Sequence, residues 1–206
     1  QMGSHRTYDV SVIVPFRDDE DLIGTVVNRL ATHLRSLHVT FEILAIDEDS
    51  GDNSHAVLAL LRTHFPELRV NQALGPGRGF DAGIRRAQGR TLWLIQPTQA
   101  MAPLSPFTRA LGQVARGQLD AVIVRQRFVV AHRLRTLDLF DGLKGAGLPF
   151  QRRFARRATV AGLRIEQHAL AADRTRPAPE RSLARFFGAL APARRRTPPP
   201  RLPIDR

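Results

Sequence analysis

Three short segments of the chain carry groups that could contact a ligand: Asp47, the glycines of Gly75–Gly79, and Gln96–Thr98. A carboxylate such as Asp47 can accept a hydrogen bond from the imino group of a nucleobase. Glycines let a backbone approach a ligand closely, although a plain surface loop can have the same composition. Gln96–Thr98 offers only neutral oxygens, whereas Mg²⁺ and Mn²⁺ prefer anionic ones. The first two segments therefore suit a nucleotide, and the third does not suit a divalent cation.

Each of these segments follows an apolar run that has the length of a buried parallel strand. Segments with helical spacing separate the runs, and Asp18–Asp21 are expected in the first turn of the first helix. The alternation predicts an α/β fold of Rossmann type, with a mostly parallel sheet flanked by helices and ligands at the carboxyl ends of its strands. The predicted strands are Val10–Val14, Phe41–Ile46, Leu68–Asn71 and Leu92–Ile95, and the predicted helices are Leu22–Leu37, one capped by Asp52–Ser54, and Asp81–Gln88.

The second half of the chain is predicted to extend this domain. Phe150–Leu163 is amphipathic, with four arginines opposite its apolar face. Residues 1–6 look like the remnant of an expression tag, residues 7–190 are expected to form the domain, and the Arg- and Pro-rich residues 191–206 cannot build a core. The other predicted elements are the strands Ala121–Val124 and Leu163–Glu166 and the helix Ser182–Leu190.

Composition and charge narrow the classes of function. The chain has no cysteine, which excludes disulfides and thiolate metal sites, and it shows no signal peptide and no apolar run long enough to span a membrane. These features predict a cytoplasmic protein. Of the net charge of +12, residues 151–206 supply most, with 14 arginines against four acidic residues. This region predicts an anionic membrane surface or a protein as partner, rather than nucleic acid; a solvated basic surface is the alternative.

The segment around the predicted helix Ser182–Leu190 bears on the membrane prediction. Leu183, Phe186, Phe187 and Leu190 recur at helical spacing among arginines. Such a helix could lie on the inner face of a membrane, or it could pack its phenylalanines against the sheet while its arginines face water.

Several motifs in this order resemble the family-2 glycosyltransferases of GT-A fold, especially the dolichol-phosphate-mannose-synthase-like branch. The resemblance covers most of residues 9–190 and implies a GT-A-like fold. It lies in Pro15–Glu20 (family pattern P-x-Y-N-E-E, with Arg17 in place of the aromatic), Ile46–Ser54 (V-D-D-G-S-x-D-N-T), the glycine-rich turn Gly75–Gly83, Gln88–Arg90 (A-x-G-D) and the late helix and strand from Leu148 to Ile165.

The resemblance implies a site for a nucleotide or a nucleotide sugar. It assigns Asp47 to the base and Glu20 to the base or the ribose, while helix capping and turn formation are the alternative for Asp47 and the preferred explanation for Asp52. The implied nucleotide-binding residues are Pro15, Glu20, Asp47, Gly77, Arg78, Gln96 and Thr98.

The sequence departs from the family at the metal site and in the acceptor region. Family members carry two aspartates where Gln96–Thr98 stands, so the divalent cation is expected to be lost and no cofactor is predicted. Relocation of the metal to Glu48 and Asp49 is less favoured than its loss, and arginines such as Arg78 or Arg127 could compensate the phosphate charge instead.

The acceptor region is short, because only residues 129–149 separate two segments that lie more than twice as far apart in the family. Asp138 and Asp141 are the only acidic residues in this stretch and hence the catalytic candidates, with an exposed turn as the alternative. His132 and His168 are expected to be structural.

Together these features predict a glycosyltransferase-2-like protein that binds a nucleotide or nucleotide sugar. With a degenerate metal site it would be either a pseudoenzyme or a metal-independent transferase. The alternative from another class is a non-catalytic scaffold or binding module that holds a protein or an anionic membrane through its basic C-terminal region.

Overall fold

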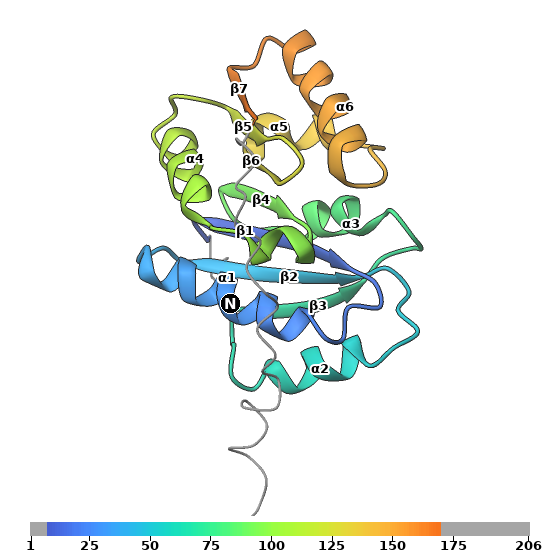
Figure 1. The fold of residues 1–206 in the computed structure, drawn as a ribbon. Helices are drawn as coiled ribbons and strands as arrows, with labels where there is room; N and C mark the ends of the chain where they lie inside the picture. The colour runs from blue at the N-terminus through green and yellow to red at the C-terminus, as the bar shows by residue number, and fades with distance from the viewer. Residues whose placement is uncertain (1–7, 170–206) are drawn as a thin grey trace, which may run out of the picture.

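The computed structural model describes residues 8–169 (Figure 1). The predicted tag remnant, the helix Ser182–Leu190 and the Arg- and Pro-rich tail lie outside these residues, as do the boundaries at 190 and 191. The membrane-facing helix and the partners inferred from it therefore stay predictions. Within the described residues, no helix is both long and apolar enough to span a membrane.

A single mixed sheet organises the described residues, with the strand order β3-β2-β1-β4-β6-β5-β7. The pairs β1–β2, β1–β4, β2–β3 and β5–β7 are parallel, and β6 runs antiparallel to both β4 and β5. The expected mostly parallel α/β sheet is confirmed. The strands are β1 Val10–Phe16, β2 Phe41–Asp47, β3 Leu68–Gln72, β4 Thr91–Ile95, β5 Ala121–Val124, β6 Phe128–His132 and β7 Ile165–His168.

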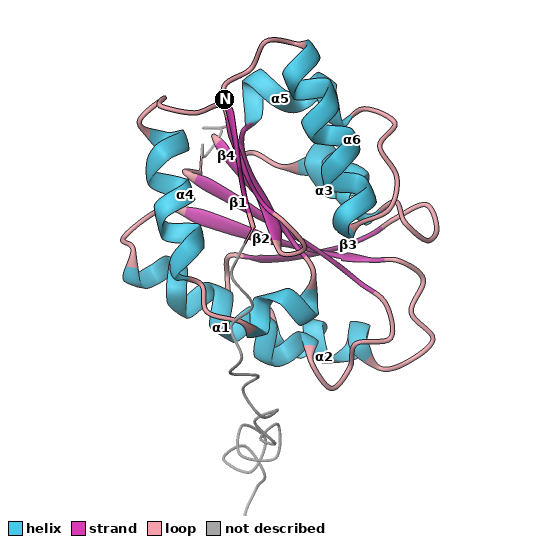
Figure 2. Ribbon diagram, turned by 45° about the horizontal axis from the view of Figure 1, so that its top comes forward, coloured by secondary structure: helices cyan, strands magenta, loops and turns pink. Residues whose placement is uncertain are grey.

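Helices cover both faces of the sheet (Figure 2). One face packs against α1 Ile23–Ser36, α2 Ser54–Leu61, the 3₁₀ helix η1 Pro97–Met101 and α4 Ser105–Ala115. The other face packs against α3 Gly79–Arg86, α5 Arg133–Phe140 and α6 Gly147–Val160.

The central strands are buried on both faces, which explains their continuous apolar runs. Every residue of β1, β2 and β4 is buried. On the α4 side, the rings of Trp93 and Phe107 stack with centroids 3.5 Å apart. On the α6 side, Phe140 and Phe154 stack at 4.4 Å. Two aromatic clusters therefore fix the second half of the sheet between α4 and α6.

Local structure differs from the sequence-based expectation in two places. Asp18–Asp21 precede α1, whose first turn has no acidic residue, because turns at the carboxyl end of β1 use Asp18, Asp19 and Glu20. Strand β6 was not predicted as a separate element, and neither were α4 and α5. The tight turn Arg125–Arg127 separates β5 from β6, so the two strands form an antiparallel hairpin inside an otherwise parallel pattern.

Candidate functional site

The predicted site residues gather along the carboxyl edge of the sheet. In the register of β1 and β2, Phe16 pairs with Asp47, so the turns that follow these strands lie side by side. Gln96 follows the neighbouring strand β4. The structure thus brings Glu20, Asp47 and the Gly75–Gly79 turn to one edge, as an α/β sheet places the loops that bind ligands.

Asp47 ends β2 and is buried, with 6% of its surface exposed. Its Oδ1 accepts hydrogen bonds from the backbone N–H of Ser50, at 2.9 Å, and from the Ser50 hydroxyl, at 2.7 Å. Its Oδ2 lies 4.0 Å from Nδ1 of His55 and accepts no hydrogen bond from any described residue. One carboxylate oxygen therefore forms the turn, and the other has lone pairs for a ligand.

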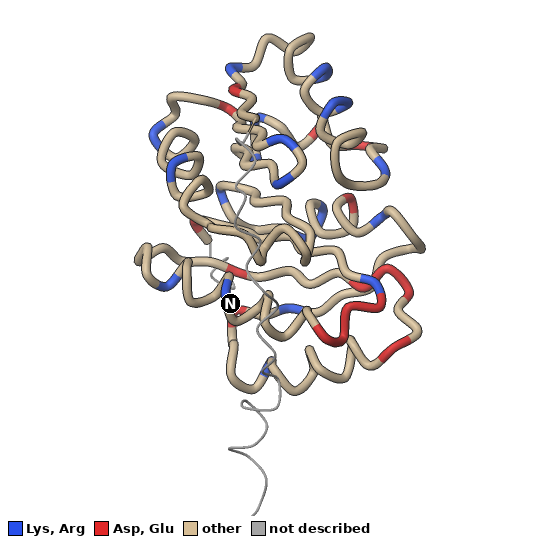
Figure 3. Tube along the Cα trace, in the orientation of Figure 1, with Lys and Arg blue, Asp and Glu red and all other residues tan. Residues whose placement is uncertain are grey.

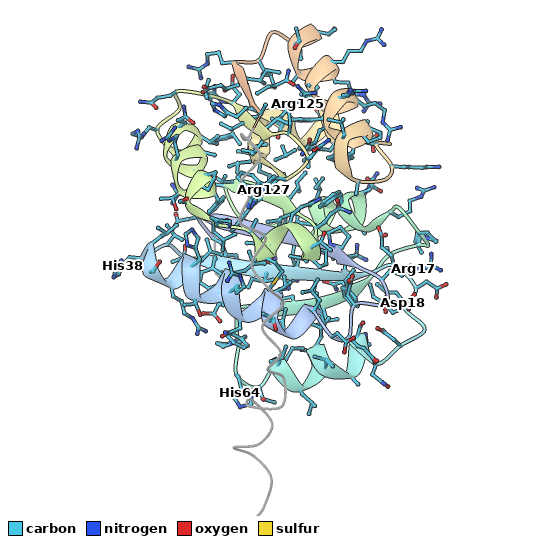
Figure 4. All side chains as sticks on the ribbon, in the orientation of Figure 1. Arg17, Asp18, His38, His64, Arg125 and Arg127 are labelled. Atoms are coloured by element: carbon cyan, nitrogen blue, oxygen red, sulfur yellow. The ribbon has the colours of Figure 1, made fainter. Side chains whose placement is uncertain are left out.

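The acidic side chains around Asp47 serve backbone amides instead. Asp18 accepts a hydrogen bond from Gly51 N–H at 2.7 Å, and Glu20 accepts one from Asn53 N–H at 2.8 Å. Asp52 accepts from the first N–H of α2, at Ser54, and from Glu20 N–H, both at 2.9 Å. Figure 3 shows these acidic residues together on the loops after β1 and β2, and Figure 4 marks Arg17 and Asp18 there.

These contacts alter the acidity of two carboxyl groups in the cluster. Burial raises the pKa of Asp19, in spite of a hydrogen bond from Arg17 N–H, and the charges of Asp52 and Asp18 raise it further. Burial would also raise the pKa of Asp52, but hydrogen bonds from Ser54 and Glu20 outweigh it and lower the pKa. Asp52 thus forms the turn before α2, as expected, whereas the N-cap residue is Asn53 and makes no capping bond with its side chain.

The glycine-rich turn is held by Glu48. The Gly79 N–H, at the start of α3, donates to Glu48 Oε1 at 2.6 Å. A Cβ at Gly79 would lie 2.4 Å from the Cβ of Pro15, so only glycine fits between β1 and this helix. The Gly77 carbonyl accepts from Gly145 N–H at 2.7 Å, which joins the turn to the loop before α6. Sequence reasoning did not foresee the roles of Glu48 and Gly145. For Glu48, the only signal was its position as an acidic residue directly after Asp47.

Gln96 begins the 3₁₀ helix η1 at the end of β4. Its backbone N–H donates to Gln99 Oε1 at 3.1 Å, and Gln99 Nε2 donates to Gln96 Oε1 at 2.9 Å. Pro97 takes the first helical position, where no backbone donor is needed, and Thr98 is exposed. The residues at this strand end therefore form a self-satisfied helix cap.

Asp138 and Asp141 line a different cavity, of about 690 Å³, with Arg85 and Arg133 between α3 and α5. Asp141 is 73% exposed and accepts a hydrogen bond from Arg85 at 2.8 Å. His132 lies at the opposite end of the sheet from Gln96, because it pairs with the first residue of β4, Thr91. The structure thus does not bring His132 to the nucleotide-site residues.

Residues 11–96 match the family model described as glycosyl transferase family 2. The family resemblance is confirmed. The matched segment runs from β1 to the first residue after β4, and so contains the motifs from Pro15–Glu20 to Gln88–Arg90 but not the late helix and strand.

Solved structures of glycosyltransferases share the fold. They include a mannosyltransferase from Pyrobaculum calidifontis in complex with GDP-Man and Mn²⁺, with a TM-score of 0.64 and 15% identity over 79% of this chain and 55% of that one. Glucosyl-3-phosphoglycerate synthase from Mycobacterium tuberculosis, in complex with Mn²⁺, UDP and phosphoglyceric acid, matches with a TM-score of 0.62 and 17% identity. The match covers 89% of this chain and 74% of that one. TarS 1–349 from S. aureus matches with a TM-score of 0.59 and 16% identity over 80% of this chain and 59% of that one.

These matches show the GT-A glycosyltransferase fold, as the sequence motifs led us to expect. The chain spans just over half the length of the mannosyltransferase and of TarS 1–349. It covers more of the phosphoglycerate synthase, about three quarters.

Proposed function

We propose that this protein binds the nucleoside diphosphate part of a nucleotide sugar along the carboxyl edge of β2, β1 and β4, without a divalent cation held after β4. The observation that carries the proposal is the buried Asp47 carboxylate, which keeps Oδ2 open while Oδ1 forms the turn. A buried acceptor at the end of a central strand can pair with the imino group of a base. Asp47 also lies inside the segment that matches the glycosyltransferase family.

The phosphate groups would lie toward the glycine-rich turn. Arg78 immediately precedes α3, and its carbonyl accepts a hydrogen bond from Ala82 N–H, whereas its guanidinium makes no hydrogen bond or ion pair with any other described residue. Gly77, with φ +70°, and Gly79 leave the turn without side chains on either side of this guanidinium. Arg78 is therefore the cation that we assign to the diphosphate.

The residues after β4 do not fit a divalent cation. Gln96 and Thr98 carry neutral oxygens, and the Gln96 amide is already paired with Gln99. Glu48 Oε1 accepts from the Gly79 N–H, and residues 8–169 contain no group of three His, Cys, Asp or Glu side chains that could hold a metal ion. We therefore propose that the nucleoside diphosphate binds without a divalent cation. A turnover assay then distinguishes a metal-independent transferase from a pseudoenzyme.

Calorimetric titration with UDP and GDP tests the base contact. The substitution Asp47→Asn keeps an oxygen for Ser50 but replaces the open acceptor with an amide. Since hydrogen bonds to charged groups contribute about 1.5–3 kcal/mol, affinity should fall about tenfold or more.

Asp21→Asn is the matched control, because it removes the same charge from an exposed position in the neighbouring loop between β1 and α1. It should change affinity by less than about twofold. Undetectable binding of both nucleotides by the unmutated chain, or equal binding by Asp47→Asn, would contradict the proposal.

A further inference from the structure

A second cavity opens at the far end of the sheet, between α4 and the strands β5 and β7. Its volume is about 360 Å³. Val122 and Val124, two residues apart on β5, form an apolar floor, and Ser105, Arg109 and Gln113 line it from one face of α4 at intervals of four residues. The cavity is thus built by three elements rather than by a single loop.

This cavity is separate from the proposed nucleotide site. In the strand order, β1, β4, β6 and β5 lie between β2, which carries Asp47, and β7. With neighbouring strands about 4.8 Å apart, β2 and β7 are roughly 24 Å from each other. The cavity also lies on the α4 face of the sheet, whereas the glycine-rich turn leads into α3 on the other face.

A chain of polar contacts fixes one wall of the cavity. Gln113 Nε2 donates to Glu166 Oε2 at 3.0 Å, and Nε2 of His168 lies 3.1 Å from Glu166 Oε1. Because a carboxylate only accepts, the amide of Gln113 must present its nitrogen to Glu166. Its Oε1 is then buried and has no hydrogen-bond partner among the described residues. A buried acceptor without a hydrogen-bond donor destabilises the folded protein, so a ligand that donates to this oxygen would remove that cost.

The α4 wall also carries a positive charge, one helical turn before Gln113. Arg109 is exposed at the rim and makes no ion pair with a described residue. Glu166 keeps its negative charge, but its oxygens contact Gln113 and His168, and it forms no ion pair with Arg109. An anionic group at Arg109 would therefore meet a guanidinium without a competing carboxylate.

We propose that this cavity binds a small hydroxylated anion, that is, a phosphate ester or carboxylate that also carries a free hydroxyl group. Arg109 pairs with the anionic group, Gln113 Oε1 accepts the hydroxyl proton, and the carbon skeleton lies on Val122 and Val124. The volume is at the low end of the range for ligand pockets, about 300–1,000 Å³, which excludes a dinucleotide.

Glycerol 3-phosphate is the probe, titrated into the full chain with calorimetry and followed by amide chemical shifts. We expect saturable binding with shifts at Val122, Val124 and His168. Arg109→Gln should weaken binding about tenfold or more. Arg116→Gln removes the same charge from the exposed residue that follows α4, outside this cavity, and should leave affinity within about twofold.

Titration with inorganic phosphate distinguishes the contact at Arg109 from the contact at Gln113. Gln113→Met removes the acceptor, so it should weaken glycerol 3-phosphate several-fold but inorganic phosphate hardly at all, whereas Arg109→Gln should weaken both. Asp47→Asn should leave both affinities unchanged, since the nucleotide site is elsewhere. Absence of saturable binding by the full chain, shifts confined to the Asp47 edge, or equal losses with Arg109→Gln and Arg116→Gln would overturn the proposal.

Discussion

The two ends of the carboxyl edge use their polar side chains in opposite ways. At the β1–β2 end, acidic residues are dense, yet Asp18, Glu20, Glu48 and Asp52 all accept hydrogen bonds from backbone amides of neighbouring turns. At the β5–β7 end, acidic residues are fewer, but an exposed arginine and an amide oxygen have no partner among the described residues. The number of acidic groups at an edge is therefore a poor guide to where a ligand binds.

The hydrogen bonds of the carboxylates explain this difference between the two ends. A carboxylate that accepts from a turn cannot serve a ligand with the same lone pairs, so the acid-rich loops are mostly scaffold. Oδ2 of the buried Asp47 accepts no hydrogen bond from a described residue, and we assign it to a base. Groups that only hold the scaffold should affect stability, whereas ligand-binding groups should affect affinity.

The largest expected effect is at the turn that Glu48 holds. Gly79→Ala would place a Cβ 2.4 Å from Pro15 and 2.6 Å from Glu48 Oε1, which forces the helix away from β1. Overpacking and the strained hydrogen bond together should lower the free energy of unfolding by about 3 kcal/mol, measured by urea denaturation.

Gly51→Ala is the control for Gly79→Ala. Its added Cβ would meet nothing closer than 3.8 Å, so stability should change by less than about 0.5 kcal/mol. Equal losses in the two variants would show that the tight contact at Pro15 does not exist.

The next effect is at the other end of the sheet, where the buried carboxylate of Asp120 pairs with the half-exposed Arg135 and Arg164. Burial alone would raise the pKa of Asp120, but hydrogen bonds from Arg164 and Arg135 outweigh it and lower the pKa to about 2. Against an unfolded pKa of about 3.9, this shift corresponds to about 2 kcal/mol of stability. Asp120→Asn should lose roughly that amount at neutral pH.

The pH dependence follows from the direction of this shift. A lowered folded-state pKa stabilises the protein above the unfolded value, and the contribution disappears as the pH falls through the folded value. The stability difference between the unmutated chain and Asp120→Asn should thus be constant above about pH 5 and shrink between about pH 4 and pH 2. A difference that persists unchanged at pH 2 would contradict the assignment.

The smallest effect is expected at Asp141. Its ion pair with Arg85 is exposed, and Arg157 contacts its carbonyl rather than its carboxylate. Asp141→Asn should change the free energy of unfolding by less than about 0.5 kcal/mol. A larger loss would mean that this carboxylate belongs to the scaffold, which would remove it as a catalytic candidate.

Much of this fold was predictable, because buried parallel strands leave continuous apolar runs such as Phe41–Ile46. The hairpin β5–β6 was not, since the turn Arg125–Arg127 carries none of the glycine or asparagine that marks such turns. Motifs likewise located the edge where Asp47 and Gln96 lie. They could not reveal which acidic side chains accept hydrogen bonds from the turns, because this depends on contacts such as that of Glu48 with Gly79, 31 residues apart.

The central claim is nucleotide binding without a cation at the end of β4. The most direct measurement is the affinity of the unmutated chain for UDP and GDP in excess Mn²⁺ and again in excess chelator. The account predicts measurable binding of at least one nucleotide, with the two affinities within about twofold of each other. Binding that tightens about tenfold or more with Mn²⁺, or that requires it, would contradict the account.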